Sequence, residues 1–106
     1  MSAGRYRTPV ELEEPVRTQS ADGSAVLVHV PAGTDFAEIR CLRQDEAVLS
    51  DRVDGMATHE ICLRYREDIA GGWLVAAKGR RFRILSAADE DLRGRTVLCL
   101  AEEEET

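Results

Sequence analysis

The sequence predicts an all-β protein: a small antiparallel β-barrel of about six or seven strands, with one or two short helical turns and one long loop. Apolar and polar residues alternate along most segments, which is the period of a β-strand. Clusters of glycine, proline, aspartate and serine separate these segments, and the 106 residues suffice for one domain. A barrel is favoured over an open sheet because closure removes exposed strand edges.

The alternation places the strands in a definite order. The expected strands cover residues 5–19, 25–30, 34–43, 58–66, 73–77, 80–85 and 95–101. In the first, Pro15 interrupts the alternation, so we expect a long, bent edge strand. Ser20 to Ser24 form a turn around Asp-Gly, and Pro31-Ala32-Gly33 ends the second strand.

The remaining segments are predicted to be turns, a loop and a tail. Lys78-Gly79 signals a tight hairpin, and residues 86–93 are polar, with Ser86 and Asp89 able to cap one helical turn. Residues 44–56 form a long connection, which is either functional or only a spacer. The run of glutamates in residues 102–106 predicts an acidic, disordered tail, which leaves residues 1–101 as a single barrel domain.

Composition excludes several classes of protein. The chain has 14 basic and 20 acidic residues, a net charge of −6, whereas a free-standing non-specific nucleic-acid binder needs a basic surface. No apolar run is long enough to span a membrane, and the N-terminus lacks the apolar region of a signal peptide. We therefore expect no membrane association.

The three cysteines are expected to be free thiols. No Cys-x-x-Cys spacing occurs, and neither histidine completes a zinc pattern, so we expect no metal and no cofactor. Cys41 shares a strand face with Ala37 and Ile39, and Cys99 shares one with Val97 and Ala101, so both are expected to be buried. Cys62 lies on a charged face and is expected to be more accessible.

The sequence offers no set of catalytic residues, so we expect that the protein is not an enzyme. His29 and His59 are far apart and neither accompanies a nucleophile motif; no glycine-rich loop opens a helix. Trp73 and Phe82 are expected in the core. The one basic cluster, residues 78–83, could be a hairpin that touches a nucleic-acid backbone. We favour instead a strand with a solvated basic face, or a surface that pairs with an acidic protein neighbour, because the rest of the chain is acidic.

The order of several segments matches a known family. The segments are Arg7 to Leu12, Phe36 to Ile39, Thr58 to Ile69 with its Arg-Tyr-Arg-x-Asp-Ile ending, Gly72 to Val75, Gly79 to Leu85, the polar turn Asp89 to Arg93, and the closing strand Thr96 to Leu100. On these segments the sequence resembles the bacteriophage head–tail joining proteins, also called head-closure or stopper proteins, including relatives in prophages and gene transfer agents. The resemblance covers residues 5–101 and lacks the family's tryptophan ahead of the Phe36 strand.

The resemblance implies a structural ring component of the neck of a phage or phage-like particle. Six or twelve copies would form a closed ring that connects the portal or adaptor ring to the tail-terminator or tail proteins and retains packaged DNA. DNA would pass through the channel without sequence-specific binding, and an acidic lining would let it slide because like charges repel. The alternative is a small OB- or SH3-like module that binds nucleic acid or peptide.

The resemblance also implies two groups of site residues. The long loop would reach the channel and gate it through Asp45, Glu46, Val48, Leu49, Asp51, Arg52, Val53, Asp54 and Met56. Contacts to neighbouring subunits or partner proteins are expected from Arg64, Arg66, Asp68, Arg80, Arg81 and Arg83.

Overall fold

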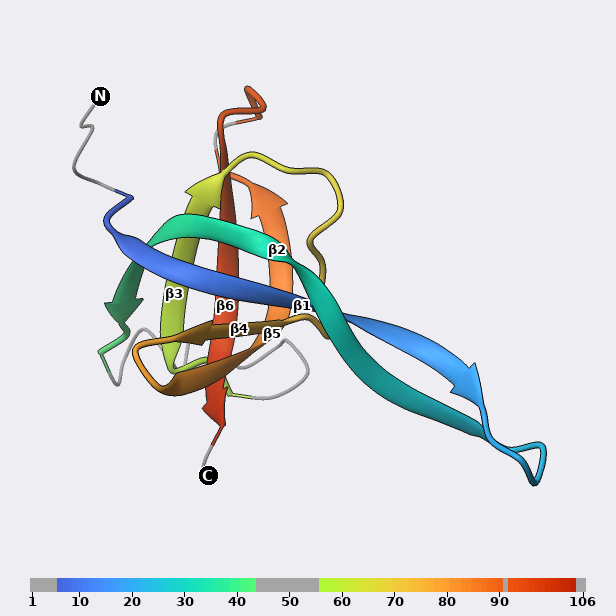
Figure 1. Cartoon of the computed structure of the whole chain (residues 1–106). Coiled ribbons are helices and arrows are strands. Elements are labelled where there is room, and N and C mark those ends of the chain that lie inside the picture. The colour runs from blue at the N-terminus through green and yellow to red at the C-terminus, as the bar shows by residue number, and fades with distance from the viewer. Residues whose placement is uncertain (1–5, 44–55, 91, 105–106) are drawn as a thin grey trace.

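The computed structural model describes residues 6–43, 56–90 and 92–104. These residues form six strands: β1 (Thr8–Gln19), β2 (Ala25–Cys41), β3 (His59–Arg64), β4 (Leu74–Ala77), β5 (Arg80–Asp89) and β6 (Thr96–Glu104). The strands close into a barrel in the order β1-β2-β3-β6-β5-β4, and every neighbouring pair is antiparallel (Figure 1). The predicted antiparallel barrel is therefore confirmed.

Strand β2 runs continuously through the segment that the sequence predicted to end it. Pro31 pairs with Glu13 beside a register shift in β1, which is a position where a proline is tolerated in a sheet. Gly33 has a φ of +112°, a backbone conformation that favours glycine, and so the strand bends there without ending. The two strands expected at 25–30 and 34–43 are one, and the described barrel has six strands.

Strand β1 is not an edge strand in its first half. Glu11 to Glu13 pair with β4 on one side, while the strand pairs with β2 along most of its length. From Glu14 onward β1 pairs only with β2, and this part of the ribbon projects from the barrel (Figure 1). We call this two-stranded projection, Glu14–Gln19 with Ala25–Val30 and the turn between them, the arm.

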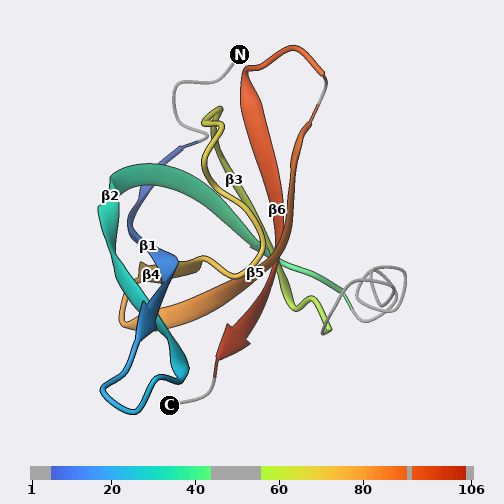
Figure 2. The same ribbon diagram turned by 90° about the vertical axis from the view of Figure 1, so that its right-hand side faces the viewer.

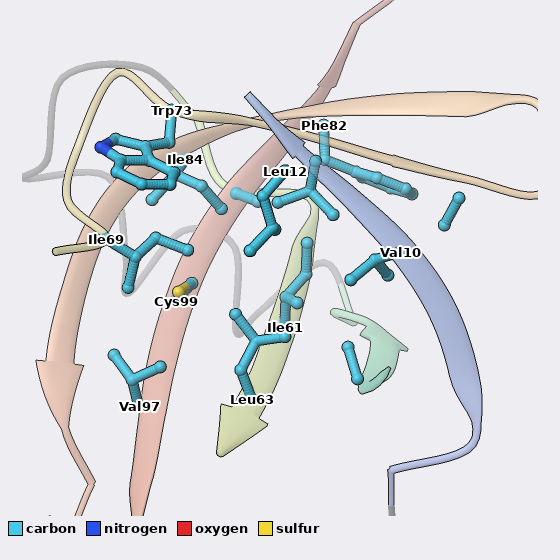
Figure 3. Close-up of a cluster of buried hydrophobic side chains, with 14 residues drawn as sticks. Val10, Leu12, Ile61, Leu63, Ile69, Trp73, Phe82, Ile84, Val97 and Cys99 are labelled. Atoms are coloured by element: carbon cyan, nitrogen blue, oxygen red, sulfur yellow. The ribbon is translucent and has the colours of Figure 1, made fainter. Parts of the chain in front are cut away.

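The barrel interior is filled by alternate residues of the strands, as the period-two pattern predicted. Large side chains in the core come from β1, β3, β5 and β6 and from the segment before β4, as Figure 3 shows for Val10, Leu12, Ile61, Leu63, Ile69, Trp73, Phe82, Ile84, Val97 and Cys99. Phe82 is only 1% exposed. The predicted core positions of Trp73 and Phe82 are confirmed.

The turn between β4 and β5 has the conformation that its sequence predicts. Lys78 and Gly79 both have positive φ, 53° and 76°, and Ala77 pairs with Arg80 across a two-residue loop. Two positive φ angles define the tight type I′ hairpin turn, whose twist suits the flanking strands. The expected hairpin is confirmed.

The described residues contain no helix, so the predicted helical turn at residues 86–93 is wrong. Ser86 to Asp89 continue β5 and pair with β6 after a register shift between Ile84 and Ser86. Asp89 accepts a hydrogen bond from the backbone of Gly94, N to Oδ2 2.7 Å, and so stabilises the β5–β6 turn. Pairing with β6 replaces the local hydrogen bonds that a helical turn would have made.

The acidic C-terminus is also ordered further than the sequence predicted. Glu102 to Glu104 belong to β6 and pair in register with Arg83, Phe82 and Arg81 of β5. Each of these glutamates is half-buried, because the arginines of β5 lie beside them. Residues 105–106 lie outside the described residues.

Two of the three cysteine predictions are corrected. Cys99 is fully buried, and this burial raises the pKa of its thiol to about 12. Cys41 is exposed; it is the last residue of β2 and pairs with His59 at the end of the β2–β3 ladder. Cys62 is buried, and Glu38 and Leu98 flank it in the neighbouring strands.

Candidate functional site

The predicted gating residues fall almost entirely outside the described part of the chain. Asp45, Glu46, Val48, Leu49, Asp51, Arg52, Val53 and Asp54 lie within residues 44–55, which the structure does not describe. Met56 is described, and its side chain is exposed next to the start of β3. The gating prediction therefore stays a prediction.

The three predicted contact residues of β5, Arg80, Arg81 and Arg83, form ion pairs within the chain itself. The guanidinium of Arg80 donates to both carboxylate oxygens of Glu103, Nε to Oε2 2.8 Å and Nη2 to Oε1 2.6 Å. Arg83 Nη2 lies 2.8 Å from Glu102 Oε1. These arginines thus pair with acidic residues of the chain's own strand β6; contact of the basic cluster with an acidic protein neighbour stays a prediction.

Arg81 pairs with acidic residues of the two strands that flank the β4–β5 hairpin, β1 and β6. Arg81 Nη2 lies 3.3 Å from Glu13 of β1, and Arg81 Nε lies 4.0 Å from Glu104 of β6. These side chains are partly exposed, and ion pairs of this kind contribute little to stability. Their main effect is on charge, because they leave little free positive charge on β5 to attract DNA phosphates.

Arg66 and Asp68 form a separate ion pair after β3. Arg66 donates through Nε and Nη2 to both carboxylate oxygens of Asp68, each at 2.8 Å. The guanidinium also lies 5.8 Å from the ring centre of Trp73 and donates to the carbonyl of Ala32 at 3.5 Å. The hydrogen bonds raise the pKa of Arg66 and lower that of Asp68, so both remain charged at neutral pH.

The six predicted contact residues do not form one patch. Arg64 lies over the ring of Tyr6, 5.3 Å from its centre, near the end of β3. β3 ends at the top of the barrel in Figure 1, whereas the β4–β5 turn that precedes Arg80 lies at the lower left. Arg80, Arg81 and Arg83 lie on β5, with Arg80 on the side of Phe82 and the other two on the opposite side, and Arg64, Arg66 and Asp68 lie elsewhere.

His59 is buried at the base of β3 and is only 6% exposed. Its ring packs edge-on against Phe82, with the ring centres 4.9 Å apart, and its Nδ1 lies 2.9 Å from Thr58 Oγ1. Burial lowers the pKa of His59; the nearby Glu103 carboxylate opposes this effect without cancelling it. The imidazole is thus held neutral as a packing residue.

The low pKa of His59 predicts a pH dependence of stability. A folded pKa below the unfolded one means that protonation favours the unfolded chain, so stability is complete above about pH 6.5 and falls as the pH drops below it. Urea unfolding measured between about pH 7.5 and pH 5.5 should show this loss for the wild type and for His29→Gln. In His59→Gln the dependence over this range should be clearly weaker; an unchanged dependence would contradict the assignment.

The arm is the most prominent feature of the surface. Its turn is tight: Ser24 N donates to Asp22 Oδ1 at 3.0 Å, and Gly23 has a φ of +89°. Hydrogen bonds from Ser20 and Ser24 lower the pKa of Asp22, so its carboxylate stays ionised. At the base of the arm, His29 Nε2 lies 2.9 Å from the carbonyl oxygen of Gly72, which fixes one face of the ribbon against the barrel.

The opposite face of the arm carries a row of valines. Residues that face each other or alternate along the two strands share a face of the ribbon, and this face carries Glu14 together with Val16, Thr18, Val26, Val28 and Val30. Val26 is 42% exposed and Val28 37%, whereas Val16 and Val30 are half-buried; Leu27, 59% exposed, lies on the other face. We call the four valines and Thr18 the valine face.

Comparison with known proteins identifies the family. The model of the phage head completion protein family matches residues 1–104. The chain belongs to this family. The resemblance found in the sequence is thereby confirmed, and the protein is a structural component of the head or neck of a virion or virion-like particle.

Solved structures show the same fold. Protein SF1141 from Shigella flexneri 2a is 23% identical, with 99% of this chain and 100% of that chain covered and a TM-score of 0.74. A chain from the virion of a native gene transfer agent particle is also 23% identical, with 96% and 98% covered and a TM-score of 0.69. No curated protein matches the chain.

The described surface of this head completion protein offers little for other chemistry. Within residues 6–43, 56–90 and 92–104, no group of three or more His, Cys, Asp or Glu side chains could hold a metal ion. Trp73 and Phe82 are buried in the barrel, whereas Phe36 and Tyr65 are exposed. Among the same residues, no helix has the length and apolar character needed to cross a membrane.

Sequence reasoning missed the valine face. Its signal was present, since valine and threonine alternate on both sides of the Asp22-Gly23 turn. The alternation predicted two strands and a turn, but a strand pattern does not tell how far a hairpin extends past its barrel. The hairpin projects beyond the residues at which β4 stops pairing with β1 and β3 stops pairing with β2. Those limits depend on residues distant in sequence.

Proposed function

We propose that this head completion protein is a subunit of a closed ring in the neck, which joins the portal or adaptor ring to the tail and retains packaged DNA. The observation that carries the proposal is the family match, because it extends over residues 1–104 and so includes the whole barrel. Six or twelve copies would form the ring, and its partners would be the adaptor or portal ring on one side and the tail-terminator or tail proteins on the other.

The charges of the barrel fit this role. The net charge is −6, and the arginines of β5 are neutralised by glutamates of β1 and β6. A ring of such subunits repels DNA phosphates and does not bind them, so DNA could slide through the channel. Blocking the channel would then be a mechanical task, which we propose for residues 44–56 from the family resemblance.

Reconstitution tests the proposal. DNA-filled heads are prepared from a host that lacks the gene for this chain, and the purified full-length protein is added. We expect nuclease protection of the packaged DNA and competence for tail joining to be restored together. Heads that gain neither property, although the added protein is folded, would overturn the proposed function.

A loop variant separates closure from joining in the same assay. Replacing residues 46–54 with a short Gly-Ser linker should leave binding to heads intact and should abolish nuclease protection. If the variant protects the DNA as well as the wild type does, closure does not depend on this segment.

A further inference from the structure

The arm leaves two strand edges and one apolar face without a partner in the described barrel. β4 pairs with β1 only at Glu11 to Glu13, and β3 pairs with β2 only from Ala37 to Cys41. The outer edges of the arm therefore lack a backbone partner among the described residues. A two-stranded ribbon is marginally stable in water by itself, and open edges invite pairing with another chain. Contact with a partner molecule would relieve both problems.

A complementary groove lies on the other side of the same barrel. It has a volume of about 480 Å³ and is lined by residues of β1, β2 and the β4–β5 hairpin. Its apolar lining comes from Pro9, Val10, Ala76 and Ala77, and its charged lining from Glu11, Lys78, Arg80 and Arg81. The exposed ring of Phe36, two residues beyond Thr34, lies on the same face of β2. The apolar part of this lining fits a row of valines.

The arm and the β4–β5 turn that borders the groove extend from opposite sides of the barrel. In Figure 1 the arm extends to the lower right, and the β4–β5 turn that borders the groove lies at the left of the barrel. Figure 2 is turned so that the arm points toward the viewer, which places that turn behind the barrel. The long dimension of the molecule, 51 Å against 29 Å across, reflects this projection. Surfaces on opposite sides of one subunit make head-to-tail contacts, the kind that close into rings.

Charge favours the same arrangement. Lys78 is exposed at the rim of the groove and makes no ion pair with any residue that the structure describes. The turn of the arm carries Asp22, whose carboxylate is always ionised at neutral pH. A cation at the rim and an anion at the tip attract each other when the ribbon is laid along the groove.

We propose that the valine face of one copy's arm packs into the groove of the next copy, so that arm and groove form the repeating contact of the ring. The occupant of the groove is a second copy of this chain. This inference rests on the proposed function, since it supplies the contact by which the proposed ring would close.

Cross-linking in assembled particles tests the contact. Thr18 lies on the valine face and Thr34 lines the groove, and both are exposed, so Thr18→Cys and Thr34→Cys are mild changes. They are introduced together into a Cys41→Ser chain, in which the remaining Cys62 and Cys99 are buried. Within one subunit, Thr34 pairs with Glu11, and Glu11 lies seven residues from Thr18 along β1. Positions 18 and 34 of the same subunit are therefore roughly 20 Å apart, which is more than a short bismaleimide can span.

The double variant should give a ladder of multimers of this chain, and each single variant should give only monomers. Dimers from Thr18→Cys alone would show arm-to-arm pairing and would overturn the proposal. Cross-links of the double variant to a different particle protein, or the absence of any cross-link, would also overturn it. Particles that hold no wild-type chain would instead refute the proposed function, so the two failures are distinct.

A charge variant provides an independent test. Val26→Asp with Val28→Asp places two carboxylates on the valine face without touching the barrel core, and Leu92→Asp, at an exposed position far from either surface in sequence, is the control. We expect unchanged thermal unfolding for both. Incorporation into particles should fall at least about tenfold for the arm variant, because burying unpaired charge is costly. Incorporation of the arm variant at the wild-type level would contradict the proposal.

Discussion

Replacing Phe82 with alanine is expected to lower the free energy of unfolding by about 3–5 kcal/mol, the usual cost of removing a buried aromatic ring. Phe82 is one of the largest fully buried side chains of the barrel, and its ring packs against His59. The substitution leaves a cavity between β5 and β3 that the closed barrel cannot collapse to fill. Urea unfolding at neutral pH measures the loss, which is a large part of the stability of a small domain.

Phe36 provides the matched control for this substitution. It is also a phenylalanine in a barrel strand, but its side chain is 52% exposed. Phe36→Ala should change the free energy of unfolding far less than Phe82→Ala does. Equal effects of the two substitutions would mean that the barrel core is wrongly located.

Removing residues 102–106 is expected to destabilise the fold, although the sequence predicts a dispensable tail there. Glu102 to Glu104 pair with β5, and the backbone of Glu103 donates to Thr58 Oγ1 at 2.9 Å. Backbone hydrogen bonds contribute about 0.5–1.5 kcal/mol each, so losing this end of the ladder should cost on the order of 2–3 kcal/mol. Thermal or urea unfolding of the truncated chain measures the difference.

A charge-only variant separates the ladder from the ion pairs. Glu102→Gln, Glu103→Gln and Glu104→Gln together keep the backbone of β6 and remove the acidic partners of the β5 arginines. Because exposed ion pairs contribute little, this variant should be clearly more stable than the truncation. If truncation changes nothing, these residues form only a tail; if the two variants are equally destabilised, charge rather than strand pairing holds the segment.

Local patterns in the sequence were enough to predict the fold class and most of the core. The inward positions Ile61 and Leu63 of β3, and Phe82 and Ile84 of β5, follow directly from period-two alternation. This works because alternation depends only on neighbouring residues. The tight turn at Lys78-Gly79 was predictable for the same reason, since two residues define it.

Features that depend on distant partners were not predictable in this way. The glutamates after Ala101 look like a solvated tail until β5 places arginines beside them. Cys41 follows the buried alternation of Ala37 but lies where the β2–β3 ladder ends, and so it is exposed. The partner of each strand, and therefore the end of each ladder, is decided by residues far away in the chain.

For the candidate site, too, features that depend on distant strand partners were not predictable from local sequence. The family resemblance correctly indicated a phage head protein, whereas the ion pairs of the basic cluster with glutamates of the same chain were not predicted. The identity of those groups depended on the pairing of β5 with β6. The arm was missed because its projection is a property of the whole barrel and not of the valine pattern alone.

Electron cryo-microscopy of the particles that contain this chain tests the central claim most directly. We predict that the barrel is found in the neck as a closed ring of six or twelve copies, between the portal or adaptor ring and the tail, with each arm in contact with the neighbouring copy. A chain located away from the neck, or present there without forming a closed ring, would contradict the account.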